Sequence, residues 1–192
     1  MNRSIILTGI KHCGKSTQGR IVSRMLRIPF YDTDDVIAEL TGKTPRQIYS
    51  ELGKQEFLKA ETQACMHLCG RLNPASAEKK CAVIATGGGI CCNEAAVSLL
   101  KKEGIFVFLK ADERIVSERV MREIKTAEDG TLFNMPAYIA QKHPSSLSEA
   151  RAVFHDFFTE REKIYSSLAD ITVDMKDDSK SGNAEKIVRA VS

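Results

Sequence analysis

The chain has 192 residues, of which 43% are hydrophobic and 28% charged, and it carries a formal net charge of +3. This composition is that of an ordinary soluble protein, and so small and scattered a positive charge excludes a typical nucleic-acid-binding protein. The N-terminus carries no apolar signal core, and no apolar stretch is long enough to cross a bilayer. We expect one domain over residues 1–192, acting as a cytoplasmic monomer without a nucleic-acid or membrane partner.

Short runs rich in Val, Ile and Phe alternate with helical stretches along the chain. The predicted strands cover residues 4–8, 29–31, 81–86, 104–109 and 170–173. The predicted helices cover residues 15–26, 34–40, 55–72, 93–101, 112–124, about 145–168 and 184–191. This βαβ alternation predicts an α/β, three-layer fold: a five-stranded parallel sheet with helices on both faces.

Two stretches interrupt this alternation. Residues 41–45 carry signals that end one predicted helix and begin another. Residues 73–76 end the long helix predicted over 55–72. Residues 125–148 carry Gly130, Pro136 and Pro144 and are the weakest stretch for regular structure. A segment of this length is usually a lid or disordered, and we expect a lid insertion here.

A complete phosphate-binding loop, G-x-x-x-x-G-K-S, follows the first predicted strand. Its glycines allow a tight loop whose backbone N–H groups point at phosphate oxygens, and the next helix adds its positive end. The lysine of this motif reaches the β- and γ-phosphates of a nucleoside triphosphate, and the serine hydroxyl lies on Mg²⁺. The expected nucleotide-binding residues of the loop are Gly9, Cys13, Gly14, Lys15, Ser16 and Thr17.

Asp32 and Asp34 follow the second predicted strand, at the sheet edge where ligands of α/β sheets bind. On an extended segment, carboxylates two residues apart project to the same side, so both can face the phosphate loop while Asp35 points away. One could hold magnesium through water and the other a substrate hydroxyl. The alternative is that Asp34 or Asp35 merely caps the following helix.

Gly87, Gly88 and Gly89 come just beyond the third predicted strand. Three successive glycines leave backbone N–H groups uncovered, so a ligand oxygen or ring can approach closely. The alternative is a flexible turn between a strand and a helix.

The six cysteines contain no C-x-x-C pair, and we expect free thiols. Cys65 and Cys69 are four residues apart on a predicted helix and could share a metal with Cys91 or Cys92. Small buried apolar residues are the simpler interpretation.

Together these motifs resemble the shikimate kinases, a family of nucleoside monophosphate kinase-like P-loop kinases. The resemblance covers most of the chain. Beyond the motifs above it includes residues 41–43, 48–49, 53–57, Glu61 and 161–165. It implies ATP-dependent phosphorylation of a ring hydroxyl of a small molecule, shikimate, with Mg²⁺.

The resemblance also implies roles for residues around the nucleotide. Lys15 stabilises the transferring phosphoryl group, while Ser16 and, through water, Asp32 hold Mg²⁺. Asp34 anchors and deprotonates the accepting hydroxyl, and Arg119 packs against adenine.

On the acceptor side, the resemblance implies that the 87–89 glycines cover the substrate with N–H groups and that Arg161 binds its carboxylate. The chain departs from the family where an arginine is expected after Phe57, because this position is Leu58. An apolar side chain cannot replace the bidentate contact of an arginine with a carboxylate.

A second departure lies in residues 125–148, where the family carries an arginine followed by Pro-Leu-Leu. The nearest match here is Gly130-Thr131-Leu132-Phe133. Lys142, His143 and Arg151 are candidates to replace the missing cations, although His143 can equally be a solvated loop residue.

The sequence thus predicts a shikimate kinase or a close relative. One alternative is a kinase for another small hydroxylated acid, such as a gluconate-like sugar acid. The other is a nucleotide-binding regulatory protein that has no turnover.

Overall fold

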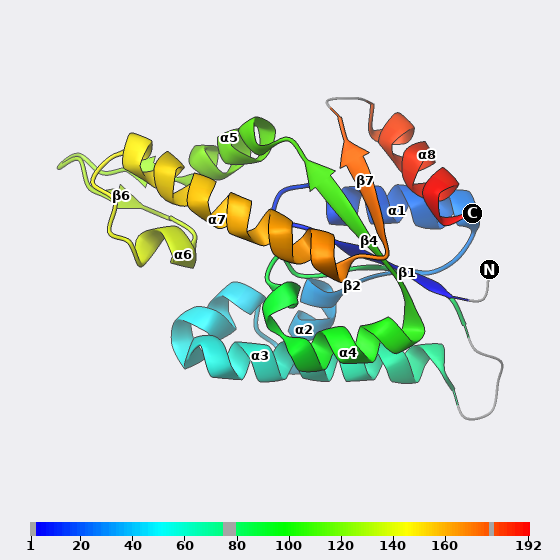
Figure 1. Cartoon of the computed structure of the whole chain (residues 1–192). Coiled ribbons are helices and arrows are strands. Elements are labelled where there is room, and N and C mark those ends of the chain that lie inside the picture. Colours follow the sequence, from blue (N-terminus) through cyan, green and yellow to red (C-terminus); the bar gives the residue numbers. More distant parts are fainter. Residues whose placement is uncertain (1–2, 75–79, 177–178) are drawn as a thin grey trace.

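The computed structural model describes residues 3–74, 80–176 and 179–192. A parallel sheet with strand order β2-β3-β1-β4-β7 forms its centre (Figure 1). Its strands are β1 (Ser4–Thr8), β2 (Phe30–Asp32), β3 (Val83–Ala85), β4 (Gly104–Ala111) and β7 (Ile171–Met175). The predicted five-stranded α/β sheet is confirmed.

The central strand β1 is buried along its whole length, as expected for a strand covered on both faces. Ile6 lies opposite Ile84 of β3 and Phe106 of β4 in the sheet register. Because all these strands are parallel, their carboxyl ends meet at one edge, where the phosphate loop, Asp32 and the glycine turn follow.

Helices cover both faces of the sheet. The helices of the described residues are α1 (Lys15–Leu26), α2 (Thr33–Thr41), α3 (Pro45–Leu72), α4 (Glu94–Glu103), α5 (Glu113–Glu123), α6 (Ala137–Ala140), α7 (Leu147–Leu168) and α8 (Lys180–Val191). The short α6 lies away from the sheet, against α7 (Figure 1). A 3₁₀ turn, Ile90–Cys92, precedes α4. Helices α2, α3 and α4 lie on one side of the sheet and α1 and α8 on the other (Figure 1). Two apolar cores fill the layers between the helices and the sheet.

Helix α3 begins well before the predicted residue 55. Thr44 and Gln47 form a reciprocal capping box, with Pro45 in the first turn, so the new start expected at residues 41–45 is confirmed. The helix is broken at Gly53, which has φ +86° and ψ 178°. Only glycine adopts this backbone conformation readily.

Residues 125–148 contain short regular elements where little regular structure was expected. Strands β5 (Lys125–Thr126) and β6 (Leu132–Phe133) pair in antiparallel fashion, and α6 follows them. Leu132 and Ile139 are buried in the core cluster that also contains residues of α5 and α7. These two apolar anchors explain why the segment has local order despite its glycine and prolines.

Within the described ranges, no helix combines the length and apolar character needed to span a membrane. The expected end of the long helix at 73–76 falls partly outside the described residues. Inside them, α3 ends at Leu72, and Asn73 N–H bonds the Cys69 carbonyl.

Two glycines allow a matched test of backbone packing. A Cβ at Gly104 would lie 2.3 Å from the Ser4 carbonyl oxygen of the paired strand, whereas a Cβ at Gly70 in α3 would meet no atom within 4 Å. We expect Gly104→Ala to lower the free energy of unfolding by about 2 to 3 kcal/mol. Gly70→Ala should raise it by roughly 0.5 to 1 kcal/mol, because alanine favours the helix. Urea unfolding of both variants measures these changes, and an equally stable Gly104→Ala variant would contradict the packing.

Candidate active site

The phosphate loop is held in its tight curve by close backbone packing. Gly9 has φ +143°, and a Cβ there would lie 2.9 Å from Cys13 Sγ and 3.0 Å from the Leu109 carbonyl oxygen. Gly14 has φ +101° and immediately precedes α1. Both glycines of the motif are therefore required by the loop conformation itself.

Lys15 lies within this curve. Its side chain is buried, and its Nζ donates hydrogen bonds to the carbonyl oxygens of Gly9 at 2.8 Å and Ile10 at 2.9 Å. Cys13 is also buried, with its Sγ 3.8 Å from the same ammonium. The loop thus surrounds a fixed positive charge at the N-terminus of α1, an arrangement that binds phosphate.

Ser16 and Asp32 come together at the start of α1 and the end of β2. Ser16 Oγ donates a 2.5 Å hydrogen bond to Asp32 Oδ2. The other carboxylate oxygen, Oδ1, accepts from the N–H of Asp34 and thereby caps α2. A hydroxyl oxygen of α1 and a carboxylate oxygen at the end of β2 therefore lie side by side next to the phosphate loop.

The extended geometry expected for Asp32 and Asp34 is wrong, because α2 begins at Thr33 and places Asp34 in its first turn. The capping alternative is also wrong for Asp34 and Asp35, because Asp32 is the cap. Asp35 does point away: it is exposed and lies 3.8 Å from Arg20.

Asp34 is set up as a proton acceptor near neutral pH. The Asp34 residue as a whole is exposed, but its carboxyl group faces the glycine turn, where desolvation by surrounding protein atoms, reinforced by the negative charge of Asp32, raises its pKa to about 6. The nearby positive charges of Lys15 and Lys11 oppose this shift of the pKa. A carboxylate with a raised pKa beside a phosphate-binding cation is typical of a catalytic base.

Glu61 of α3 is a second buried carboxyl group at the site, and it was not among the predicted site residues. It is fully buried, and Asn93 Nδ2 donates to its Oε2 at 3.0 Å. Among the described residues its Oε1 has no hydrogen-bond partner. Burial is the main cause that raises the Glu61 pKa, to about 7. A Cβ at Gly87 would lie 3.1 Å from both Glu61 Oε1 and Asp34 Oδ1, so both carboxyl groups face the glycine turn.

The glycine turn is fixed against the phosphate loop. Gly87 N–H donates to Thr33 Oγ1 at 2.9 Å, and the Gly88 carbonyl accepts from Tyr165 Oη at 3.0 Å. A Cβ at Gly88 would lie 2.7 Å from the backbone nitrogen of Lys11. The turn is therefore packed and hydrogen-bonded, and the expectation of uncovered N–H groups is wrong for Gly87, whose N–H is bonded to Thr33 Oγ1.

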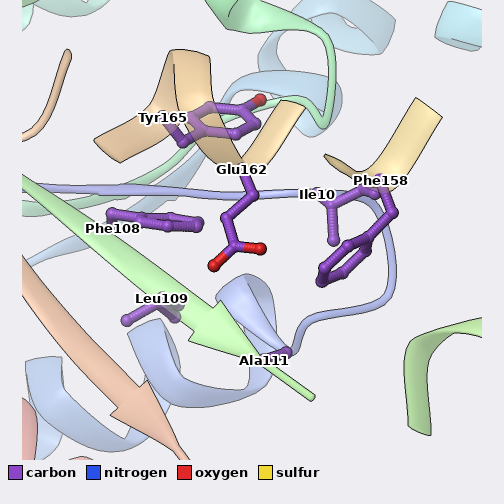
Figure 2. A pocket seen from close by; sticks show the side chains of 7 residues that line it. All are labelled: Ile10, Phe108, Leu109, Ala111, Phe158, Glu162 and Tyr165. Carbon is purple, nitrogen blue, oxygen red and sulfur yellow. The ribbon is translucent and has the colours of Figure 1, made fainter. Parts of the chain in front are cut away.

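Tyr165 also anchors α7 to the sheet next to the glycine turn. Its ring stacks on Phe108 of β4 with a centroid distance of 5.5 Å. Figure 2 shows both rings beside a small void that is also lined by Ile10 of the phosphate loop and Glu162 of α7. Strand, loop and helix thus share one packed layer, which fixes the position of α7 relative to the loop.

Arg161, one turn before Tyr165 on α7, lies beside the residues that follow the glycine turn. Its Nη1 donates to Cys91 Sγ at 3.1 Å and also contacts Cys92 Sγ. The guanidinium carbon lies 4.9 Å from the Phe157 ring centroid. Its Nε is buried without a hydrogen-bond partner in the described part of the chain. The cation expected to bind a carboxylate is therefore close to the glycine turn.

Arg119 borders a cavity of about 270 Å³ between the phosphate loop and the C-terminal part of the chain. The cavity is lined by Gly14 and Thr17 from the phosphate loop and by Lys176 and Lys180 from the C-terminal part of the chain. Arg119 Nη1 donates to the His12 carbonyl at 2.7 Å. Loop residues and three cations thus surround a space next to the phosphate-binding position, as a nucleotide requires.

The remaining candidates lie at the surface or do not converge. Lys142, His143 and Arg151 all have exposed side chains. All six cysteines lie in the described ranges and none forms a disulfide, and Cys65 is fully buried. No group of three or more His, Cys, Asp or Glu side chains in the described ranges is arranged to hold a metal, so the shared cysteine site is not supported.

Comparison with known proteins identifies relatives of this chain. The sequence model of the family described as shikimate kinase matches residues 11–192. The shikimate kinase of Aquifex aeolicus is 34% identical, with 88% of this chain and 84% of the relative aligned. That of Caldanaerobacter subterraneus subsp. tengcongensis is 28% identical, with 98% and 95% aligned.

Solved structures point in the same direction. The shikimate kinase from Acinetobacter baumannii in complex with shikimate superposes with a TM-score of 0.75 and 25% sequence identity. The superposition covers 97% of this chain and 91% of that one.

The buried Glu61 carboxyl group predicts how stability depends on pH. Its pKa is raised in the folded protein from 4.5 to about 7, so between these values the folded state binds more protons than the unfolded state. Stability therefore falls as pH rises from about 4.5 to 7, and Glu61→Gln should remove this loss. We expect urea unfolding to show Glu61→Gln more stable than wild type at pH 8 by about 3 kcal/mol. The difference should vanish near pH 4.5, and equal stability at pH 8 would contradict the buried carboxylate.

Proposed function

This chain belongs to the shikimate kinase family, and we propose that its site transfers the γ-phosphoryl group of ATP to a ring hydroxyl of shikimate, a step of aromatic amino acid biosynthesis. The observation that carries the proposal is the contact between Gly88 and Lys11. This contact holds the phosphate loop, with its buried Lys15, against the glycine turn. The glycine turn in turn faces the Asp34 carboxyl group, whose pKa is raised. A phosphoryl donor and a hydroxyl acceptor would meet across this contact.

On the donor side, Lys15 neutralises the charge that develops on the transferring phosphoryl group. The loop N–H groups and the N-terminus of α1 position the β- and γ-phosphates. Arg119 and Thr17 lie at the 270 Å³ cavity, which would take the rest of the nucleotide, with Arg119 against adenine. These roles require phosphates to replace the carbonyl partners of Lys15.

Magnesium fits the donor set of this site. Ser16 offers a hydroxyl oxygen and Asp32 a carboxylate, and they already lie within hydrogen-bonding distance. Mg²⁺ prefers such hard oxygen ligands and is commonly held by one or two protein groups together with substrate phosphates. Bound there, with Asp32 acting through water, it would neutralise phosphate charge during transfer.

On the acceptor side, Asp34 accepts the proton of the attacking hydroxyl. The N–H groups of Gly88 and Gly89 cover the substrate, because that of Gly87 is bonded to Thr33 Oγ1, and Arg161 binds the substrate carboxylate. Arg161 now contacts two thiols, which are weak hydrogen-bond acceptors, so a carboxylate would be the stronger partner. We propose that residues 125–148 act as the lid of this site, within a cytoplasmic monomeric enzyme of one domain.

The proposed activity is tested by ADP release with shikimate, gluconate and nucleosides as acceptors. We expect turnover with shikimate, and none in Lys15→Ala, which should remain folded. Preferential turnover with gluconate would favour the sugar-acid alternative. ATP binding without turnover on any acceptor would favour the regulatory one.

Asp34 should control the acid side of the pH profile. A base with a pKa of about 6 must lose its proton to act, so kcat/KM should fall about tenfold per pH unit below pH 6. Asp34→Asn keeps the size but cannot accept a proton, and we expect kcat to fall about 10²- to 10⁴-fold. Steady-state kinetics from pH 5 to 8 measure both effects. A variant that loses only stability would show that Asp34 is not the base.

Leu58 tests how the acceptor carboxylate is bound. Leu58 is partly buried on α3, one turn before Glu61, whose Oε1 lacks a partner in the described part of the chain. In Leu58→Arg the guanidinium can reach both this oxygen and a bound carboxylate. We expect the KM for shikimate to fall about tenfold or more. Leu58→Met is the uncharged control, and an unchanged KM in Leu58→Arg would place residue 58 outside the acceptor site.

A further inference from the structure

The phosphate loop carries a second lysine, Lys11, whose partner is an acidic residue on another element. Lys11 Nζ lies 3.4 Å from Glu123 Oε2, and His12 Nε2 lies 3.4 Å from Glu123 Oε1. Glu123 is the last residue of α5. Burial is the main cause that lowers the pKa of His12, so at neutral pH the imidazole is uncharged. Lys11 is therefore the cation of this three-residue cluster.

Lys11 lies on the acceptor side of the loop. Its backbone packs against Gly88, whereas the neighbouring His12 carbonyl is bound by Arg119 on the nucleotide side. The positive charge of Lys11 acts on the Asp34 carboxyl group, because Lys11 is one of the two lysines that lower the Asp34 pKa. With phosphates bound at the loop as proposed, an ammonium on the acceptor side would face the terminal phosphate and not the base or ribose.

The contact with Glu123 is weak enough to be exchanged. The Lys11 side chain is 58% exposed and that of Glu123 41%, and ion pairs of such exposure contribute about 0 to 1 kcal/mol. A terminal phosphate presents three strong acceptor oxygens and more charge than a carboxylate. A terminal phosphate bound next to Lys11 would therefore replace Glu123 as the partner of the lysine.

We propose that Lys11 is a second cation for the γ-phosphate of ATP, and that Glu123 holds it until the nucleotide binds. This inference rests on the proposed binding of ATP at the phosphate loop. It adds a specificity: Lys11 contacts the terminal phosphate only, so it distinguishes ATP from ADP and acts on the group that is transferred.

Two substitutions have opposite expected effects. Lys11→Met should weaken binding of the non-hydrolysable β,γ-imido analogue of ATP about tenfold or more, while ADP binding changes by less than about twofold. Glu123→Gln removes the competing carboxylate and should tighten binding of the analogue without affecting ADP. Lys11→Arg should retain most of the affinity for the analogue. Isothermal titration calorimetry with Mg²⁺ gives all these affinities.

A matched control is Lys59→Met, which removes the same charge from an exposed lysine that pairs with Glu56 at 2.7 Å on α3. This variant should bind both nucleotides like wild type. The proposal is overturned if Lys11→Met weakens both nucleotides equally or neither. It is also overturned if Glu123→Gln weakens the analogue, as a purely structural ion pair requires.

The outcome separates this inference from the proposed function. If wild type binds neither nucleotide, the phosphate-loop assignment fails and the inference fails with it. If wild type binds both and Lys11→Met binds the analogue equally well, the role of Lys11 alone is wrong. Should Lys11→Met fail to fold, Lys11→Arg and Glu123→Gln decide, because only a released lysine tightens analogue binding in Glu123→Gln.

Discussion

The close approach of two backbone segments, at Gly88 and Lys11, is the constraint on which the site depends. A single Cβ at residue 88 would lie 2.7 Å from the Lys11 nitrogen, and main-chain atoms cannot move aside as a flexible side chain can. The Tyr165 hydroxyl and Thr33 hold the glycine turn from two further elements. The separation between the phosphate loop and the acceptor turn is therefore set by backbone packing, and phosphoryl transfer requires such fixed positioning.

Much of the fold follows from local patterns that the sequence displays directly. Apolar runs specify the sheet, and α1 spans the predicted residues 15–26 because the glycine-rich loop defines where it begins. The shape of the 32–35 segment was mispredicted because capping by Asp32 starts α2 one residue after β2. The break at Gly53 likewise depends on one backbone conformation that no periodicity reports.

The missed parts of the site depend on contacts between distant residues. Asn93 is 32 positions from Glu61, and Lys11 is 112 positions from Glu123. Nothing near Glu61 in the chain indicates that it is fully buried, since isolated glutamates on helices are usually exposed. Only the folded arrangement brings it beside Asp34, where two carboxyl groups of raised pKa share one small region. Such groups cost stability and are typical of functional sites.

The break at Gly53 divides α3 into two parts with different neighbours. The second part carries Glu61 and packs into the core through Ala64, Cys65 and Leu68. The first part begins at Pro45 and buries Ile48 in the same core, and its Arg46 bonds Asn134 of the 125–148 segment at 2.8 Å. Because the hydrogen-bond ladder is interrupted between them, the direction of the first part is set by its own contacts with the core and with the 125–148 segment. One glycine thus lets a single helix both bury the Glu61 carboxyl group and border the 125–148 segment.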